Sequence, residues 1–483
     1  MTSASCEERL FEAPPAVEGA VAPKPAAAKS FRSYDPDQAF LMPPSLDDWL
    51  PEDHPSRFVS ELVDDMLDLT TIYASYTEAS GAPPYHPRLM LKLLIYAYAT
   101  GVTSSREIER RCAVDVAFRF LSGNAAPGYR SVSRFRRRHL KAIKALFVQV
   151  LELCGKAGLV KLGRVAIDGT KVRAAASRHK AMSYDRMVKR QGELEAEVDA
   201  LLGEAERVDA EEDERFGPDR RGDEIPAELA RRESRLAKLR EAKEALETEA
   251  REKAAAEAAE RARARGESPE AQADAGDRAA ERAAPKPKAQ RNFTDPESRI
   301  MKMADGSFHQ CFNGQIAAVA GSGVIVGAQM SNVAPDVGHL LPVLDDVINN
   351  CEATPGQMVA DAGYWSEDNA AGVAERDVDG YIATGRTKHN EPAPSAPRGR
   401  IPKNATPKER MARKLRTKKG KAIYARRKVD VEPIIGQMKG RQNAGKVRLR
   451  GLDGASGEWL LHCLCHNVLK LHGARPQPGL AGT

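Results

Sequence analysis

Two short apolar runs of this 483-residue chain each end on an aspartate that is followed within two residues by a glycine. The first run reads "RVAIDG" and ends at Asp168, and the second reads "MVADAG" and ends at Asp361. Apolar runs of this length, bounded by turn residues, are typical of buried strands. A lone aspartate at a strand end is usually a turn former, because its side chain caps the next backbone amides. A functional interpretation therefore needs partner carboxylates elsewhere in the chain.

Strand and helix patterns alternate around these two runs. "GQIAAVAGSGVIVGAQM" follows the first run and "DGYIATG" follows the second, with the helical patterns "DVGHLLPVLDDVIN" and "SEDNAAGVAERD" between them. This order predicts an α/β domain with a mixed sheet flanked by helices. Carboxylates at the ends of adjacent strands raise each other's pKa, and a divalent cation removes that penalty. Carboxylate oxygens are the ligands that Mg²⁺ or Mn²⁺ prefers.

A third acid is expected in "YARRKVDVEPIIGQMKG", where Glu432 is the candidate. Lys439 lies seven residues later and shares a helical face with Glu432. Asp430 competes for the role, but it lies nearly opposite Glu432 on such a helix. Pro433 directly follows Glu432 and fits either the first turn of a helix or a kink.

The segment before the first strand is helical in pattern, with apolar residues spaced by three and four between Pro and Gly residues. A helix-turn-helix and an ordinary helical bundle both fit this pattern. One basic run, "YRSVSRFRRRHLKAIK" at 129–144, mixes aromatic residues with arginines, which is typical of a helix that lies against phosphates. Its candidate DNA contacts are Arg134, Arg136, Arg137 and Arg138.

Residues 183–290 differ from the rest of the chain in being rich in Ala, Glu, Lys and Arg. Strand patterns lie on both sides, so the segment is predicted to be an insertion. Two leucine-containing runs flank "FGPDRRGDEIP", which predicts an antiparallel hairpin of coiled-coil character. The stretch beyond Gly266 has little apolar content and is expected to be a flexible return.

Charge and composition limit the partners and the compartment. From 398 to 450 the chain has 19 Lys or Arg residues against three acids, which favours a polyanion such as nucleic acid. No apolar stretch reaches the length of a membrane helix, and no signal peptide is recognised. The seven scattered cysteines suit a reducing compartment, so a cytoplasmic protein without a membrane partner is expected. "HCLCH" at 462–466 is spaced too tightly for a standard structural zinc site.

The ordered combination of these motifs resembles the DDE transposases of bacterial insertion sequences. Asp168, Asp361 and Glu432 match the three acids, and Tyr424, Arg427, Glu432 and Lys439 match the Tyr-Arg-Glu-Lys signature. The type it most resembles is the insertion sequence eleven-eighty-two type, which is related to the four and five groups. Further matches are "SFRSYDPDQAFLMPPSLDDWLPEDH", "NFTDPESRIMK" and "GEWLLHCLCHNVLKL". Where that family is expected to have Gly-Tyr-Asn-x-Gln, this chain reads "CFNGQ", which keeps Asn313 and Gln315.

The resemblance implies an RNase H-like catalytic domain in which Asp168, Asp361 and Glu432 hold two divalent ions, Mg²⁺ or Mn²⁺. Tyr424, Arg427 and Lys439 would contact phosphates near the cut. The reactions would be cleavage at the element ends and strand transfer into target DNA by phosphoryl transfer. A homodimer or a larger assembly on DNA is expected, with a nucleoid-associated location.

The expected domains follow from the composition shifts and from the resemblance. They are a disordered tail at 1–30, a helical DNA-binding domain at 31–158, an RNase H-like catalytic domain at 159–182 and 291–473, the hairpin insertion at 183–290, and a tail at 474–483.

Two alternatives to an active transposase are considered. One is a catalytically silent or domesticated transposase-derived DNA-binding protein, which would keep the basic surfaces without the chemistry. The other is a structure-specific nuclease with the same fold, which would not need the N-terminal helical domain. The intact acids and the intact Tyr-Arg-Glu-Lys residues favour activity.

Overall fold

A computed structural model describes residues 45–77, 83–177, 180–216, 227–385, 399–402 and 404–475. Within 201–216 and 227–230 it describes the backbone only. The chain divides into two compact units, Met1–Ser45 and Leu46–Thr483. The predicted tail at 1–30 and most of the tail at 474–483 lie outside the described residues. Everything below concerns the second unit.

The described elements that precede the first strand are helical. Helix α3 is the most buried of them, with ten of its thirteen residues inside, because its sequence is apolar on nearly every side. Pro87 fixes its first turn, and the ring of His86 caps the helix by accepting from the backbone N–H of Arg88. The elements are α1 (Pro55–Glu61), the π-helical η1 (Leu62–Met66), α2 (Thr70–Tyr73), α3 (Pro87–Ala99), α4 (Ser105–Val114), α5 (Val116–Leu121), α6 (Tyr129–Arg138) and α7 (Leu140–Lys156).

The central sheet contains both antiparallel and parallel pairs, so the predicted α/β class with a mixed sheet is confirmed. Its order is β4-β5-β1-β7-β8, and β6 pairs with the free edge of β5 beyond β4. The β1–β5 pair is antiparallel, whereas β1, β7 and β8 run parallel to one another. The strands are β1 (Arg164–Arg173), β4 (Arg299–Lys302), β5 (Phe308–Val319), β6 (Ile325–Ser331), β7 (Gln357–Ala360) and β8 (Asp379–Ile382).

Parallel pairing brings the two predicted strand ends together. The register of β1 on β7 joins Ile167 to Ala360, so Asp168 and Asp361 are the next residues on neighbouring strands. The residues that precede the two aspartates, 165–167 in β1 and 358–360 in β7, are fully buried, which explains why each sequence is a continuous apolar run. The connections between β6, β7 and β8 are the helices α11 (Leu340–Cys351) and α12 (Glu367–Glu375).

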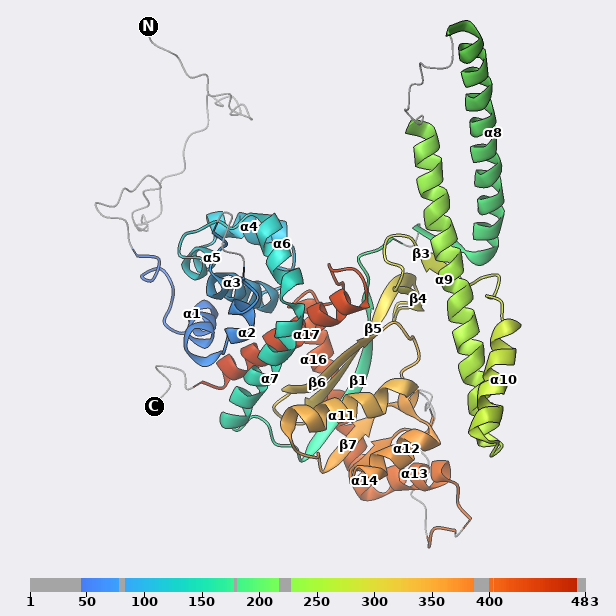
Figure 1. The fold of residues 1–483 in the computed structure, drawn as a ribbon. Coiled ribbons are helices and arrows are strands. Elements are labelled where there is room, and N and C mark those ends of the chain that lie inside the picture. The colour runs from blue at the N-terminus through green and yellow to red at the C-terminus, as the bar shows by residue number, and fades with distance from the viewer. Residues whose placement is uncertain are drawn as a thin grey trace, which may run out of the picture. The chain divides into compact units, whose positions relative to one another are not determined.

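The insertion leaves the sheet through a two-stranded ribbon of β2 (Ala181–Ser183) and β3 (Gln290–Asn292). Its long helices α8 (Tyr184–Phe216) and α9 (Ala227–Ala264) form the predicted antiparallel hairpin, visible in green in Figure 1. The return differs from the flexible segment predicted, because residues 269–281 form α10 (Pro269–Glu281) against α9. Gly276 of α10 allows the two helices to approach closely, because a Cβ at this position would lie only 3.3 Å from the carbonyl oxygen of Ala255 in α9.

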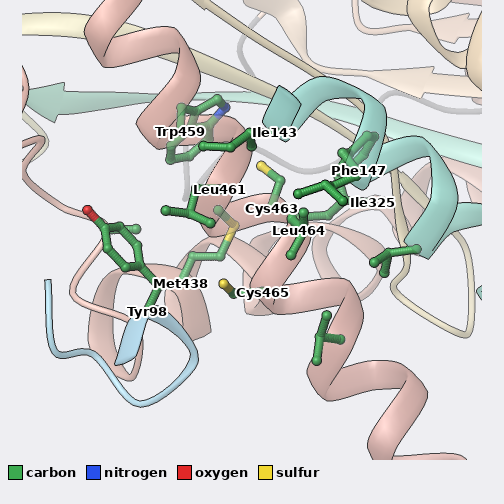
Figure 2. Packing of buried hydrophobic residues seen from close by; sticks show 14 of the residues in the cluster. Tyr98, Ile143, Phe147, Ile325, Met438, Trp459, Leu461, Cys463, Leu464 and Cys465 are labelled. Carbon is green, nitrogen blue, oxygen red and sulfur yellow. The ribbon is translucent and has the colours of Figure 1, made fainter. Parts of the chain in front are cut away.

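Helix α17 (Leu452–Gly473) lies in the main core, in contact with α3, α7 and β6. Figure 2 shows Trp459, Leu461, Cys463, Leu464 and Cys465 of this helix among side chains from α3, α7 and β6. The "HCLCH" segment is therefore part of the core. His462 and His466 are also buried.

The remaining described helices precede α17 in the chain. They are α13 (Pro407–Arg416), α14 (Lys418–Ala425), α15 (Arg427–Asp430) and α16 (Glu432–Gly440). Across the described ranges, no helix combines the length and the apolar character needed to cross a bilayer.

Candidate active site

Asp361 and Glu432 begin helices, whereas Asp168 lies inside β1, so the strand predicted to end at Asp168 continues to Arg173. Asp168 follows the buried part of β1, Asp361 caps the 3₁₀-helix η4 (Ala362–Tyr364), and Glu432 is the first residue of α16. Pro433 lies in the first turn of α16, so it starts a helix there and does not kink one.

Each of the two aspartates accepts a hydrogen bond from a nearby backbone N–H with one oxygen. Asp168 Oδ1 accepts from the backbone N–H of Gly169, and Asp361 Oδ1 accepts from that of Gly363, both at 2.8 Å. Asp361 thus has the turn-capping role that a strand-end aspartate usually has. Asp168 does not end its strand, because β1 continues to Arg173, and its second oxygen bonds Arg427.

Arg427 joins two of the acids. Its Nη1 donates to Asp168 Oδ2 at 3.1 Å and its Nη2 donates to Glu432 Oε1 at 3.0 Å. The guanidinium is only 12% exposed, and Asp168 is 16% exposed. The planar fork of arginine suits this arrangement, since its nitrogens can reach two carboxylates at once. A positive charge thus lies between acids from two distant parts of the chain.

The electrostatics of Asp168 reflect this crowding. Burial raises the pKa of Asp168 to about 6; Arg427 opposes this rise, while the charges of Asp361 and Glu432 add to it. The carboxylates therefore lie near enough to influence one another. Such a cluster is stabilised by any added positive charge.

Tyr424 and Lys439 contact different residues near the three acids. Tyr424 interacts with Arg427, and burial raises the pKa of its hydroxyl. Lys439 is partly buried, which lowers the pKa of its ammonium group, and its Nζ donates to the carbonyl oxygen of Lys171 at 3.2 Å. Lys439 thus contacts β1 three residues beyond Asp168.

Asp430, the competitor of Glu432, has another partner. It is 5% exposed and accepts two hydrogen bonds from Arg164, at 2.9 and 3.2 Å. Arg164 is the first residue of β1 and precedes Asp168 in that strand, so Asp430 is bonded away from the three candidate acids.

The four arginines of the basic run lie on α6 and are not equivalent. Arg134, Arg137 and Arg138 are exposed, whereas Arg136 is 5% exposed. Arg136 donates to the Tyr98 hydroxyl at 2.5 Å and to the carbonyl oxygen of Thr103 at 3.0 Å. Since it is enclosed by these partners, Arg136 is not placed to meet a phosphate, and the prediction that it binds DNA is withdrawn.

Arg137 and Arg138 border a cavity of about 730 Å³. Lys141 and Lys144 of α7 add two further cations to its lining, and Phe147, Met330 and Leu460 add apolar surface. Asp346 of α11 is also among the lining residues.

Sequence reasoning missed a further acid, Asp336, which follows β6. Its Oδ1 accepts from Asn313 Nδ2 at 2.7 Å and from Gln315 Nε2 at 2.9 Å. The "CFNGQ" motif therefore holds this acid. The only sequence signal was an aspartate in the turn "APD" after a strand, and nothing local connects that turn to Asp168 or Asp361.

Within the part of the chain that the structure describes, no three His, Cys, Asp or Glu side chains are close enough together to hold a metal ion. Arg427 gives the physical reason, because its guanidinium lies between Asp168 and Glu432.

Comparison with known proteins identifies two matching family models. Residues 44–138 match a family described as "Transposase domain (DUF772)", and residues 397–472 match one described as "Transposase DDE domain". Both are transposase families. No curated protein and no solved structure gives a significant match.

The two matches support an insertion-sequence DDE transposase, a class of enzyme that acts on DNA. The first transposase match ends at Arg138, the last residue of α6, and so includes the basic run. The second includes Tyr424, Arg427, Glu432 and Lys439. Neither match includes Asp168 or Asp361.

Proposed function

We propose that the chain is a DDE transposase of the insertion sequence eleven-eighty-two type, which cuts DNA at the element ends and transfers the strands into target DNA. The observation that carries the proposal is the shared guanidinium of Arg427, bonded to Asp168 and Glu432 beside Asp361. Acids from three segments of the chain influence one another there, and Glu432 lies in the region that matches the transposase DDE domain.

The strand order supports an RNase H-like catalytic domain. Taken along the chain, β1, β5 and β6 form an antiparallel set, and β7 and β8 extend the sheet in parallel from the other edge of β1. The proposed domain boundaries remain those expected from the sequence, with the insertion between Ser183 and Gln290. The helices of 31–158 are the proposed DNA-binding domain.

The donor set fits a hard divalent cation. Asp168, Asp361 and Glu432 would hold it through carboxylate oxygens alone, which suits Mg²⁺ or Mn²⁺, and two ions are proposed. When bound, the ions supply activation of the attacking water or 3′-hydroxyl and stabilise the leaving oxygen. The negative charges of Asp361 and Glu432 add to the raised pKa of Asp168, so an added cation would stabilise the cluster, and Arg427 would have to release Asp168 and Glu432 for these oxygens to bind it.

The chain's own residues would hold the DNA. Arg427, Lys439 and Tyr424 are proposed to contact phosphates near the cut, because they lie around the acids. Arg134, Arg137 and Arg138 are exposed on α6 and would contact phosphates of the element end. The cationic cavity beside Arg137 extends this surface toward α7. A dimer or larger assembly on DNA and a nucleoid-associated location are parts of the same proposal.

The proposal is tested by replacing each acid in the full chain with alanine. Asp168→Ala, Asp361→Ala and Glu432→Ala should each lower the rate of cleavage of element-end DNA by about 10³-fold or more, because each removes a metal ligand. DNA affinity should change little, since no phosphate contact is lost. The measurements are strand cleavage on gels and DNA binding by fluorescence anisotropy.

Asp345→Ala is the matched control, because Asp345 of α11 pairs with Arg376 and touches none of the three acids. It should cut normally. Cleavage retained in one of the three variants removes that acid from the proposed set. Binding without cleavage by the wild-type chain would favour the silent DNA-binding alternative.

A further inference from the structure

We propose that Asp336 is a positioning residue that sets the backbone of β1 around Asp168 and the turn that begins at Asp361, acting from the face of β1 opposite Asp168. This inference rests on the proposed function and concerns a residue outside the three acids and the Tyr-Arg-Glu-Lys residues. Register establishes the face: Asp168 pairs with Ile316, and Gly169 pairs with Gln315. Successive residues of a strand point to opposite faces, so Gln315 and its partner Asp336 lie on the side away from Asp168.

Asp336 is held tightly by one oxygen. Its Oδ1 accepts from Lys171 Nζ at 3.2 Å in addition to Asn313 and Gln315. Lys171 Nζ also donates to the carbonyl oxygen of Ala334 at 2.6 Å, which ties the loop after β6 to β1. Asn313 and Gln315 are fully buried, so these contacts belong to the interior and are little weakened by water.

This assembly lies directly against the residue after Asp168. A Cβ on Gly169 would be 2.5 Å from Gln315 Nε2 and 2.9 Å from Asp336 Oδ1. The absence of a side chain at position 169 is what allows the carboxylate and the amide to support the backbone there. The glycine that follows the first acid therefore has a physical reason.

The same assembly reaches the turn after Asp361. Tyr364, which is fully buried in that turn, donates its hydroxyl hydrogen to Gln315 Oε1. A Cβ on Gly363 would be 3.0 Å from Asp361 Oδ1 and 3.5 Å from Asp336 Oδ2. Gln315 thus bonds Asp336 and the turn after Asp361, and Asp336 lies against both β1 at Gly169 and that turn at Gly363.

Lys171 extends the connection to the signature residues. Its carbonyl oxygen accepts from Lys439 Nζ, while its own Nζ holds Asp336. A displacement of Asp336 would therefore move the β1 backbone around Asp168 and the turn of Asp361 together with the contact of Lys439. Errors of about 1 Å in such positions can reduce a rate by about 100-fold.

The experiment compares Asp336→Ala and Asp336→Asn with Asp345→Ala in the full chain. With saturating element-end DNA and Mg²⁺, Asp336→Ala should lower kcat by about 100-fold with an unchanged KM. Asp336→Asn keeps an acceptor for the same donors and should recover part of the loss. The kcat of Asp345→Ala should stay within about twofold of wild type, since the Asp345 carboxylate bonds Arg376 and none of the residues around Asp336.

A double-mutant cycle with Tyr364→Phe distinguishes positioning from plain stabilisation. If both residues act through Gln315, the double variant should be no slower than the slower single variant. Multiplied losses in kcat, or a fall in melting temperature with kcat unchanged, would overturn the proposal.

Backbone hydrogen exchange supplies a readout that needs no cleavage. Peptides covering 166–173 and 360–366 should exchange at least about tenfold faster in Asp336→Ala than in Asp345→Ala. Unchanged exchange in either peptide overturns the inference whether or not the chain cuts DNA. A wild-type chain that cuts no DNA contradicts the proposed function, and exchange then decides by itself whether Asp336 holds β1 around Asp168 and the turn after Asp361.

Discussion

His462 is a histidine that the fold keeps neutral. It is 1% exposed, its ring lies 4.8 Å from that of Tyr98, and neither ring nitrogen has a hydrogen-bond partner among the described residues. Burial lowers the pKa of His462 from 6.5 to about 3. Between these values the unfolded chain binds a proton at this residue and the folded chain does not. The free energy of unfolding therefore falls as the pH falls, by about 1.4 kcal/mol per unit from this residue.

His462→Leu should consequently stabilise the chain. The expected gain is about 1 kcal/mol at pH 7, because a buried polar ring without partners is replaced by an apolar side chain of similar size. The gain should grow as the pH is lowered from 6.5 toward 4, since leucine takes up no proton in the unfolded chain. Urea unfolding at pH 7, 6 and 5 measures the difference. A gain that stays constant with pH would contradict the neutral, buried state.

At the scale of elements, α17 packs closely on β5 because Trp459 lies against Gly314, which has no side chain. The indole Nε1–H of Trp459 donates to the carbonyl oxygen of Gln315 at 3.1 Å, and a Cβ on Gly314 would lie 2.9 Å from the indole. Gly314→Ala should therefore lower the free energy of unfolding by about 1–3 kcal/mol through overpacking. Gly155→Ala is the control, because Gly155 is exposed on α7 with open space around it and alanine there favours the helix. Equal stability of the two variants in urea would refute the close fit.

At the scale of the whole molecule, the insertion forms its own apolar cluster. Met187, Leu194, Leu236, Leu239 and Leu246 pack together, with Phe293 beside them, in a cluster distinct from the main core. The ribbon pairs Ser183 with Gln290 at its base. The two ends of the insertion are therefore adjacent, and a short turn can join them.

Replacing residues 184–289 with Asn-Gly should leave a folded protein, because that dipeptide closes a two-residue hairpin. The remainder loses the ion pairs of Glu249 with Arg291 and Arg299, both partly exposed, so the melting temperature should fall by only a few degrees. Cutting of a single DNA end should persist, and assembly of a paired-end complex should be impaired. Circular dichroism and gel shifts with two labelled ends measure these outcomes. An unfolded product would place the hairpin in the core, and unimpaired pairing would make it a spacer.

The local sequence pattern was sufficient to predict most of the secondary-structure elements. Apolar runs located β1 and β7, although β1 continues past Asp168 to Arg173, and helical periodicity located the hairpin between Ser183 and Gln290. The α10 helix was missed because its packing on α9 depends on small residues, which add little hydrophobicity to a sequence pattern.

Tertiary structure decided which charges meet. Arg427 reaches Asp168 across 259 residues of chain, and Arg164 reaches Asp430 across 266. The burial of Arg136 against Tyr98 and the arrival of Asp336 beside Gln315 and Gly169 are equally non-local. The local pattern around an ionisable residue indicates its element and its face, whereas its partner depends on which distant segments the sheet and α17 bring together. That choice belongs to the packing of the whole chain, because a buried charge is stable only where folding supplies its counterpart.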